Sequence, residues 1–478
     1  MGPRQEVSFA ALGPARATSK APRGFGVALV APLALGSLLN PINSSMIATA
    51  LEPIGRAFKT GVSETAWLVA WLFVASAVAA PAMGGLADSW GARRVFLLGL
   101  VLVLFGGIAG ALAPTLVSLV WARVLIGVGT SAPYPSAMRV LRTHARRIGR
   151  ETPRLVLSVL SLAAVSSMAI GPTLGGLLTG AAGWRSVFLV NVPLAAIGMV
   201  LCLLFVPRDE TGEREANHLA FDAPGMALFA GGVTATMLFA MDLKAPRWSL
   251  VPAAGALFVL LLVHSLRRSV EQPFIDVRML VANKPLAATY LRIGLTCVLL
   301  YVVLFGFAQW MQGALAYTPT EAGVATLPLS LTAMATSLLA ARTKTLRGPL
   351  VLAGFALLAG SGGFLLLDNH ASTFGISIVG ALFGVAQGTA SVGNQAAVYE
   401  QARASEIATA AGLHRTASYL GAVVASSLLG FFYGMRATTS DLHSLALTMT
   451  ALSALLCAGT LLDPSLRLAT KPLQRPTD

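Results

Sequence analysis

About fourteen apolar stretches follow one another along the chain, and each is long enough to cross a lipid bilayer as a single helix. A hydrocarbon core about 30 Å thick requires about 20 predominantly apolar residues in a helix. Membrane-spanning strands would alternate in polarity, and these stretches do not alternate. The sequence therefore predicts membrane-spanning helices near residues 25–51, 66–87, 94–113, 115–138, 155–181, 184–206, 223–242, 247–266, 285–312, 320–341, 347–367, 373–397, 405–434 and 442–463.

Composition supports a chain whose surface mostly faces lipid. Of its 478 residues, 55% are hydrophobic and 11% are charged, and the mean hydropathy is +0.74. Soluble domains carry about 25% charged residues, so this chain has too few charges to cover a surface in water. We expect an all-α integral membrane protein.

The distribution of basic residues predicts the orientation of the helices. Cytoplasmic segments of membrane proteins are enriched in Lys and Arg. With both termini in the cytoplasm, most of the 34 basic residues fall inside, and the outer segments contain only Arg56, Lys59, Arg185, Lys244, Arg247 and Arg436. The formal net charge of +14 is spread over short loops, so we expect anionic lipid head groups as its partner and no nucleic acid.

The first predicted span contains an unusually polar segment, LLNPINSSM, at residues 38–46. Two interpretations are open. Asn40, Asn43, Ser44 and Ser45 could line a substrate pathway, with Pro41 loosening the helix, or they could hydrogen-bond neighbouring helices. Gln309, Gln387, Asn394 and Gln395 are similar candidates in the second half.

The sequence gives no sign of a metal site, a cofactor site or an enzyme. Cys202, Cys297 and Cys457 fall within predicted spans without the spacing of metal ligands. Neither a nucleotide-binding G-x-x-x-x-G-K-[ST] loop nor a grouping of catalytic acids and histidines is found. We expect no cofactor.

Three motif regions resemble the major facilitator superfamily. GGLADSWGARRVF at 84–96 is similar to its cytoplasmic loop motif, which implies a gate formed by Gly84, Asp88, Gly91, Arg93 and Arg94; Ser89 and Ala92 depart from the usual basic residues. WARVLIGVG at 121–129 resembles its second motif and places Arg123 within the membrane, where an arginine normally faces a cavity or the bundle interior. Gly171, Pro172, Gly175 and Gly176 resemble the motif of its antiporters, with Ser167 replacing an earlier glycine.

The W-R-x-x-F-x-x-N-x-P run at 184–193 and segments 308–331 and 410–430 extend the resemblance over essentially the whole chain. They point to the fourteen-span drug:proton antiporters, whose members typically export lipophilic or cationic toxins. The fold implied is two six-helix bundles with two additional helices. Its expected divisions are a cytoplasmic tail (1–24), an N-terminal bundle (25–206), a loop with two helices (207–284), a C-terminal bundle (285–463) and a second tail (464–478).

Proton coupling is implied by this resemblance, but one residue argues against it. The family usually carries an acid in the first span, where this chain has Asn43, and asparagine does not titrate. None of the twenty acids lies near the middle of a predicted span. Glu52, His414 and Arg415 are the candidates for a substitute coupling site.

The sequence therefore predicts a monomeric secondary transporter of the inner or plasma membrane. It would export small amphipathic or lipophilic compounds by alternating access, with protons as a candidate coupling ion. The alternatives are a facilitator, a carrier coupled to another ion, and a receptor or scaffold that does not transport.

Overall fold

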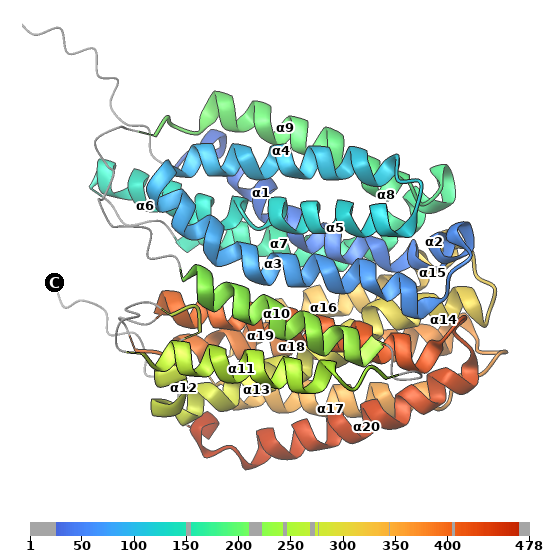
Figure 1. Ribbon diagram of the computed structural model, residues 1–478. Helices are drawn as coiled ribbons and strands as arrows, with labels where there is room; N and C mark the ends of the chain where they lie inside the picture. Colours follow the sequence, from blue (N-terminus) through green and yellow to red (C-terminus); the bar gives the residue numbers. More distant parts are fainter. Residues whose placement is uncertain are drawn as a thin grey trace, which may run out of the picture.

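The computed structural model describes residues 25–149, 154–209, 222–241, 246–267, 273–275, 277–343, 345–403 and 407–467. These residues form a bundle of long helices joined by turns (Figure 1). The expected N-terminal tail, most of the expected C-terminal tail and residues 210–221 lie outside these ranges, as do Asp242 and Glu406.

In chain order the elements are α1 (Val27–Met46), η1 (Ile47–Thr49), α2 (Leu51–Phe58), α3 (Val62–Trp90), α4 (Ala92–Ala111), α5 (Leu116–Thr130), α6 (Pro133–Ile148), α7 (Arg154–Ala182), α8 (Ser186–Leu189), α9 (Asn191–Phe205), α10 (Ala223–Met241), α11 (Leu250–Leu266), α12 (Val277–Ala282), α13 (Lys284–Val302), η2 (Val303–Phe307), α14 (Ala308–Gly313), α15 (Pro319–Ala325), α16 (Leu327–Ala340), α17 (Arg347–Phe364), α18 (Thr373–Gln401), α19 (Ile407–Tyr433), α20 (Thr439–Leu462) and η4 (Pro464–Arg467).

Ten helical segments within the described ranges are long and apolar enough to cross a membrane. Helices α10 and α11 add shorter apolar segments, Ala223–Phe239 and Leu250–Leu266. The outer helices leave large apolar side chains exposed, such as Ile197, Val200 and Leu204 of α9, which suits contact with lipid. The prediction of an all-helical membrane protein is confirmed for these ranges, and the count of fourteen spans stays a prediction.

Several predicted spans are interrupted in the structure, among them the fourth and the ninth. The fourth is divided into α5 and α6 around Ser131 and Ala132, because Pro133, at the start of α6, has no N–H with which to continue the helix. The ninth contains a π-helical turn, η2, between α13 and α14. Such turns are rare and often lie near functional sites.

The same pattern of helix pairing occurs in the two halves of the bundle. In the first half α1 packs on α7, α3 on α5, and α4 on both α5 and α9; in the second half α13 packs on α19, α16 on α18, and α17 on both α18 and α20. The halves meet along two seams. Helix α3 packs on α19, and α7 packs on α15 and α16.

Helices α10 and α11 form a hairpin that lies against α3 and α19 (Figure 1). Asp222 anchors the start of this hairpin. Its carboxylate accepts the backbone N–H groups of Gly225 (2.8 Å) and Phe274 (2.9 Å) and lies 2.6 Å from Nε2 of His264. The bond from Phe274 thereby fixes the segment that follows α11 to Asp222, the residue that precedes α10.

The bundle has two ends, which we name by the helices at each. The α15 end carries α2, α8 and α15, and the α6 end carries α6 and α12 (Figure 1). The described chain both begins and finishes at the α6 end.

Candidate functional site

A cavity lies where α7 of the first half faces α13, α16, α18 and α19 of the second half. Its volume is about 800 Å³, including space open to solvent. The lining residues are Met168, Ala169, Ile293, Thr296, Cys297, Leu300, Tyr301, Ala333, Gln387, Gly388, Ala390, Ser391, Asn394, His414 and Ser418. A mostly apolar wall with a few polar groups is typical of sites for small organic molecules.

Two of the predicted second-half residues, Gln387 and Asn394, line this cavity. Ser391 lies between them on the same helix and is exposed. Gln395 is exposed one turn beyond Ser391, outside the lining and toward the α6 end.

A buried ionic network behind Asn394 was not predicted from the sequence. Nε of Arg292 donates to Oδ1 of Asn394 (3.0 Å), Nη2 donates to Thr289 (2.7 Å), and Nη1 lies 3.2 Å from Oδ2 of Asp463. Asp463 also accepts two hydrogen bonds from Ser465. The available signal was an arginine within a predicted span, because such a residue requires a partner.

The amides of the first span join helices to one another in this structure. Nδ2 of Asn40 donates to Ser76 of α3 (3.2 Å) and Thr130 of α5 (3.0 Å). Nδ2 of the buried Asn43 donates to Oδ1 of Asn191 on α9 (2.6 Å) and to the carbonyl of Leu39 (3.0 Å). These contacts match the helix-bonding interpretation of the segment.

The two serines that follow bond mainly to their own helix. The hydroxyls of Ser44 and Ser45 donate to the carbonyl of Pro41 at 2.9 Å and 2.8 Å. Ser45 also lies 3.5 Å from the carbonyl oxygen of Ser167 on α7. None of these four polar residues is among those lining the described cavity.

Arg123 is buried in the first half without an acidic partner among the described residues. Its Nε donates to the carbonyl of Leu68 (3.1 Å), and Nη1 donates to the carbonyl of Asn43 (3.1 Å). Nη2 has no hydrogen-bond partner in the described structure. Arg123 thus connects α5 to α3 and to the polar segment of α1.

The remaining candidates are dispersed. Oε1 of the buried Gln309 has no partner in the described part of the chain, and its Nε2 bonds to Phe305 (3.1 Å). Glu52 pairs with Arg56 at the α15 end (3.0 Å). His414 lines the cavity, whereas the guanidinium carbon of Arg415 lies 3.9 Å from the centre of the Tyr134 ring. The structure therefore does not bring Glu52, His414 and Arg415 together.

The glycines of the antiporter-like motif allow α7 to approach two other elements very closely. A methyl group on Gly171 would overlap the hydroxyl of Ser45, and one on Gly175 would overlap the carbonyl oxygen of Met46. On the adjacent face, a methyl group on Gly176 would overlap the carbonyl oxygen of Pro319. Pro172 contributes its carbonyl to Thr49 (3.4 Å).

Hydrogen bonds between the halves close the α15 end. Thr173 donates to the carbonyl of Gly323 (2.9 Å), and Thr320 donates to the carbonyl of Gly176 (3.2 Å). Nε2 of Gln312 donates to the carbonyl of Thr49 (3.2 Å). These contacts join the two halves at the α15 end, whereas Arg415 of α19 stacks on Tyr134 of α6.

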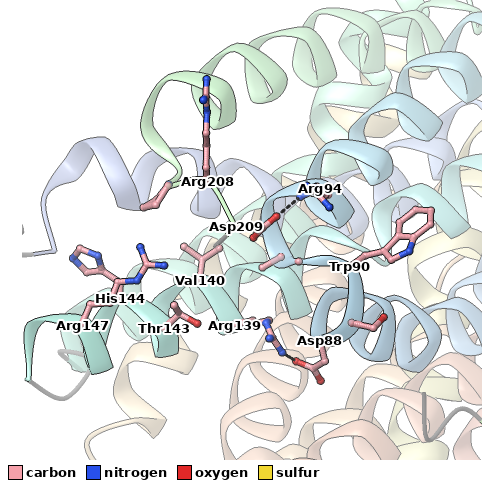
Figure 2. Close-up of a pocket in the computed structure, with 14 residues that line it drawn as sticks. Asp88, Trp90, Arg94, Arg139, Val140, Thr143, His144, Arg147, Arg208 and Asp209 are labelled. Carbon is pink, nitrogen blue, oxygen red and sulfur yellow. Dashed lines mark hydrogen bonds and ion pairs between the residues drawn. The ribbon is translucent and has the colours of Figure 1, made fainter. Parts of the chain in front are cut away.

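Figure 2 shows the pocket at the α6 end that contains the predicted gating loop. Asp88 forms an ion pair with Arg139 of α6. Asp209 accepts the backbone N–H groups of Arg93 and Arg94 (3.2 Å each), which caps the N-terminus of α4. Both contacts lie within the first half.

Two glycines position this loop. Gly91 has φ of 105°, a conformation that favours glycine, and a side chain there would overlap the Asp209 carboxylate. Gly84 faces Pro135 of α6, where a methyl group would make only an ordinary contact at 3.8 Å. The loop motif thus organises the junction of α3, α4 and α6.

The paired halves, the cavity between them and the contacts that join the halves at the α15 end are features of a membrane transporter. Comparison with known proteins agrees with this class. Residues 33–426 match the model of the Major Facilitator Superfamily. The chain belongs to this superfamily.

Among its relatives is the uncharacterized MFS-type transporter YwoD of Bacillus subtilis (strain 168), 32% identical over 87% of this chain and 92% of the relative. The multidrug resistance protein B homolog of Mycobacterium tuberculosis (strain CDC 1551 / Oshkosh) is 31% identical over 68% of this chain and 60% of the relative. The crystal structure of peptide transporter POT in complex with sulfate shares the fold, with a TM-score of 0.66 and 16% identity over 94% of this chain and 98% of that chain.

Proposed function

We propose that this protein exports small amphipathic or lipophilic compounds across the membrane by alternating access. The observation that carries the proposal is the cavity between the halves, which are joined at the α15 end by the α7–α15 seam. Its mostly apolar lining with a few polar groups is typical of small-molecule sites. The name of the Mycobacterium tuberculosis relative supports efflux of drug-like compounds.

The orientation follows from the basic residues. Arg94, Arg139, Arg147 and Arg208 gather in the pocket at the α6 end (Figure 2), and cytoplasmic surfaces are enriched in such residues. We therefore place the α6 end and both termini in the cytoplasm of the cell. In this orientation the structure represents an inward-facing state, ready to take up a compound from the cytoplasm or the inner leaflet.

The recurring pairing of helices supports two six-helix bundles, with α10 and α11 as the additional pair. This arrangement makes fourteen spans and agrees with the proposed divisions 25–206, 207–284 and 285–463. The pairing also suggests how the states interconvert. Rocking of the halves about the two seams would open the α15 end while closing the α6 end.

Coupling to protons is the weakest-supported part of the expectation. The ten described acids lie at or near helix ends. Those of α2, α15 and α20 contact the nearby Arg56, Thr318 and Thr438, and Asp463 pairs with Arg292 of α13. Asn43 occupies the first-span position in a hydrogen-bonded pair with Asn191. A facilitator or a carrier coupled to another ion therefore stays a candidate alongside the proton antiporter.

Reconstituted transport tests the proposal. Purified full-length protein in liposomes, oriented by protease accessibility, should move fluorescent amphiphiles faster than protein-free liposomes. An imposed pH gradient should increase this movement if protons are coupled, and should leave it unchanged in a facilitator. Absence of movement for neutral, anionic and cationic amphiphiles alike would contradict the transporter proposal.

A further inference from the structure

Resting on this proposed function, we propose that the cavity accepts uncharged and anionic amphiphiles and excludes permanent cations. The side chains that line the cavity and the charges immediately behind them determine which ligand charge the cavity accepts. A cation that enters a poorly hydrated site must find an opposite charge there, since its loss of hydration is otherwise uncompensated.

No aspartate or glutamate is among the lining residues in the described part of the chain. The polar groups presented to a ligand are neutral amides and hydroxyls, chiefly those of Gln387, Ser391, Asn394 and Ser418, together with the imidazole of His414. These groups can hydrogen-bond a neutral compound. They provide no formal negative charge to a quaternary ammonium group.

The charges nearest the lining are basic or already paired. Asn394 faces the cavity on one side and accepts the guanidinium of Arg292 on the other, at 3.0 Å. The nearby acid, Asp463, is the partner of Arg292 and accepts hydrogen bonds from Ser465, so its charge is already compensated. Arg415 follows His414 directly in the chain.

This arrangement favours an electron-rich group on the ligand. Oδ1 of Asn394 already accepts from Arg292, so that amide offers a ligand its N–H donors and only one remaining acceptor lone pair. Carbonyl, sulfonyl or carboxylate oxygens could accept from this group and from the hydroxyl of Ser391. The apolar wall of Ile293, Leu300 and Tyr301 would hold a hydrocarbon or aromatic part.

Three dansyl compounds provide a matched set for the test, because they share one fluorophore and differ in charge. Dansylamide is neutral, dansylglycine is an anion and dansylcholine is a permanent cation. Their fluorescence would be titrated against the full-length protein in nanodiscs near neutral pH, with empty nanodiscs as the background. The expected Kd of dansylcholine is at least about tenfold higher than that of dansylamide.

A single substitution should reverse this preference. Gln387→Glu introduces a carboxylate into the lining. We expect it to lower the Kd of dansylcholine at least about tenfold and to raise the Kd of dansylglycine. Gln395→Glu is the matched control. It adds the same charge to the same helix outside the lining, so dansylcholine should still bind poorly.

The outcomes separate this inference from the proposed function. Binding of the neutral and anionic probes with poor binding of dansylcholine supports both. Equal binding of all three probes to the native protein overturns the charge preference and leaves the transporter proposal standing. A gain in dansylcholine binding by Gln395→Glu equal to that by Gln387→Glu also overturns it, because the effect would then be one of net charge. Failure of all three probes to bind overturns both.

Discussion

Asn43 and Asn191, 148 positions apart in the chain, are joined by a hydrogen bond of 2.6 Å between Nδ2 of the first and Oδ1 of the second. The bond connects α1 to α9 in the interior of the first half, where both side chains are buried. The first-span position where the family resemblance implied an acid therefore serves here as a contact between helices. The polar side chains of the first span are explained by the hydrogen bonds that they form with neighbouring helices.

Replacing one asparagine of this pair should lower the stability of the protein more than replacing both. Asn43→Leu leaves the buried amide of Asn191 without its partner, which costs about 1–3 kcal/mol, whereas replacing both by apolar groups can be nearly neutral. Thermal unfolding in detergent would measure this. Ser44→Ala is the control because its hydroxyl bonds only to Pro41 of its own helix. A double variant less stable than Asn43→Leu would contradict the explanation.

Gly176→Ala should impair transport much more than it impairs folding. The added methyl group would overlap the carbonyl oxygen of Pro319 on α15, across the seam between the halves, and overpacking of this kind costs about 1–3 kcal/mol in the closed arrangement. Destabilising the closed state by about 1.4 kcal/mol relative to the open state changes the equilibrium between the two states tenfold. The measurement is dye efflux from proteoliposomes at matched protein content. Gly362→Ala, where the added methyl group meets nothing within 4 Å, should transport normally.

Removing the charge of only one member of the Arg292–Asp463 pair should strongly lower the stability of the fold. The side chains are 7% and 14% exposed, and Asp463→Asn would leave the guanidinium buried without its counter-charge. Removing one partner of a buried pair typically costs about 3–5 kcal/mol. Arg292→Met combined with Asp463→Asn should recover much of this loss in thermal unfolding. Strictly additive single effects would show that the two groups do not interact.

Asp222 should make the attachment of the α10–α11 hairpin dependent on pH. Burial acts to raise the pKa of its carboxyl, but the N–H groups of Phe274 and Gly225 and the ring of His264 outweigh burial, so the pKa lies below its ordinary value of 3.8. A depressed folded-state pKa contributes stability above the unfolded pKa and loses it as the pH falls through the folded value. The contribution should therefore be present at neutral pH and decline below about pH 4.

The comparison that isolates this effect is between the native protein and Asp222→Asn. Their difference in apparent unfolding temperature should be constant from neutral pH down to about pH 5 and should shrink below about pH 4. Limited proteolysis near residue 267 would report release of the segment. A difference that disappears between pH 7 and pH 6 would assign the effect to another group.

The long helices could be predicted because an apolar stretch in lipid must satisfy its backbone hydrogen bonds within itself. The glycine motif also indicated close packing of the fifth predicted span. The contacts between side chains of different helices could not be predicted from the sequence. Which residue Asn43, Arg123 or Arg292 would contact depends on the rotation of each helix and on the order of helices in space. Apolarity on all sides of a helix leaves that rotation undetermined.

The residues that line the cavity could likewise be predicted only in part. Gln387 and Asn394 were candidates because they are polar residues within a predicted span, and both line it. Asn40 and Asn43 were candidates on the same ground, yet they bond neighbouring helices instead. Polarity within a span indicates that a partner exists but does not say whether the partner is a helix or a ligand.

Alternating access at the α15 end can be tested directly with one pair of cysteines. A Cβ placed at Gly180 lies 3.4 Å from the Cβ of Thr320, close to the separation of about 3.5–4.5 Å found in disulfides. Gly180→Cys combined with Thr320→Cys should therefore cross-link α7 to α15 on oxidation. Dye efflux would be measured before oxidation, after it and after reduction, beside each single cysteine variant. Efflux should stop when the bond forms and return when it is reduced. Undiminished efflux by fully cross-linked protein would contradict it.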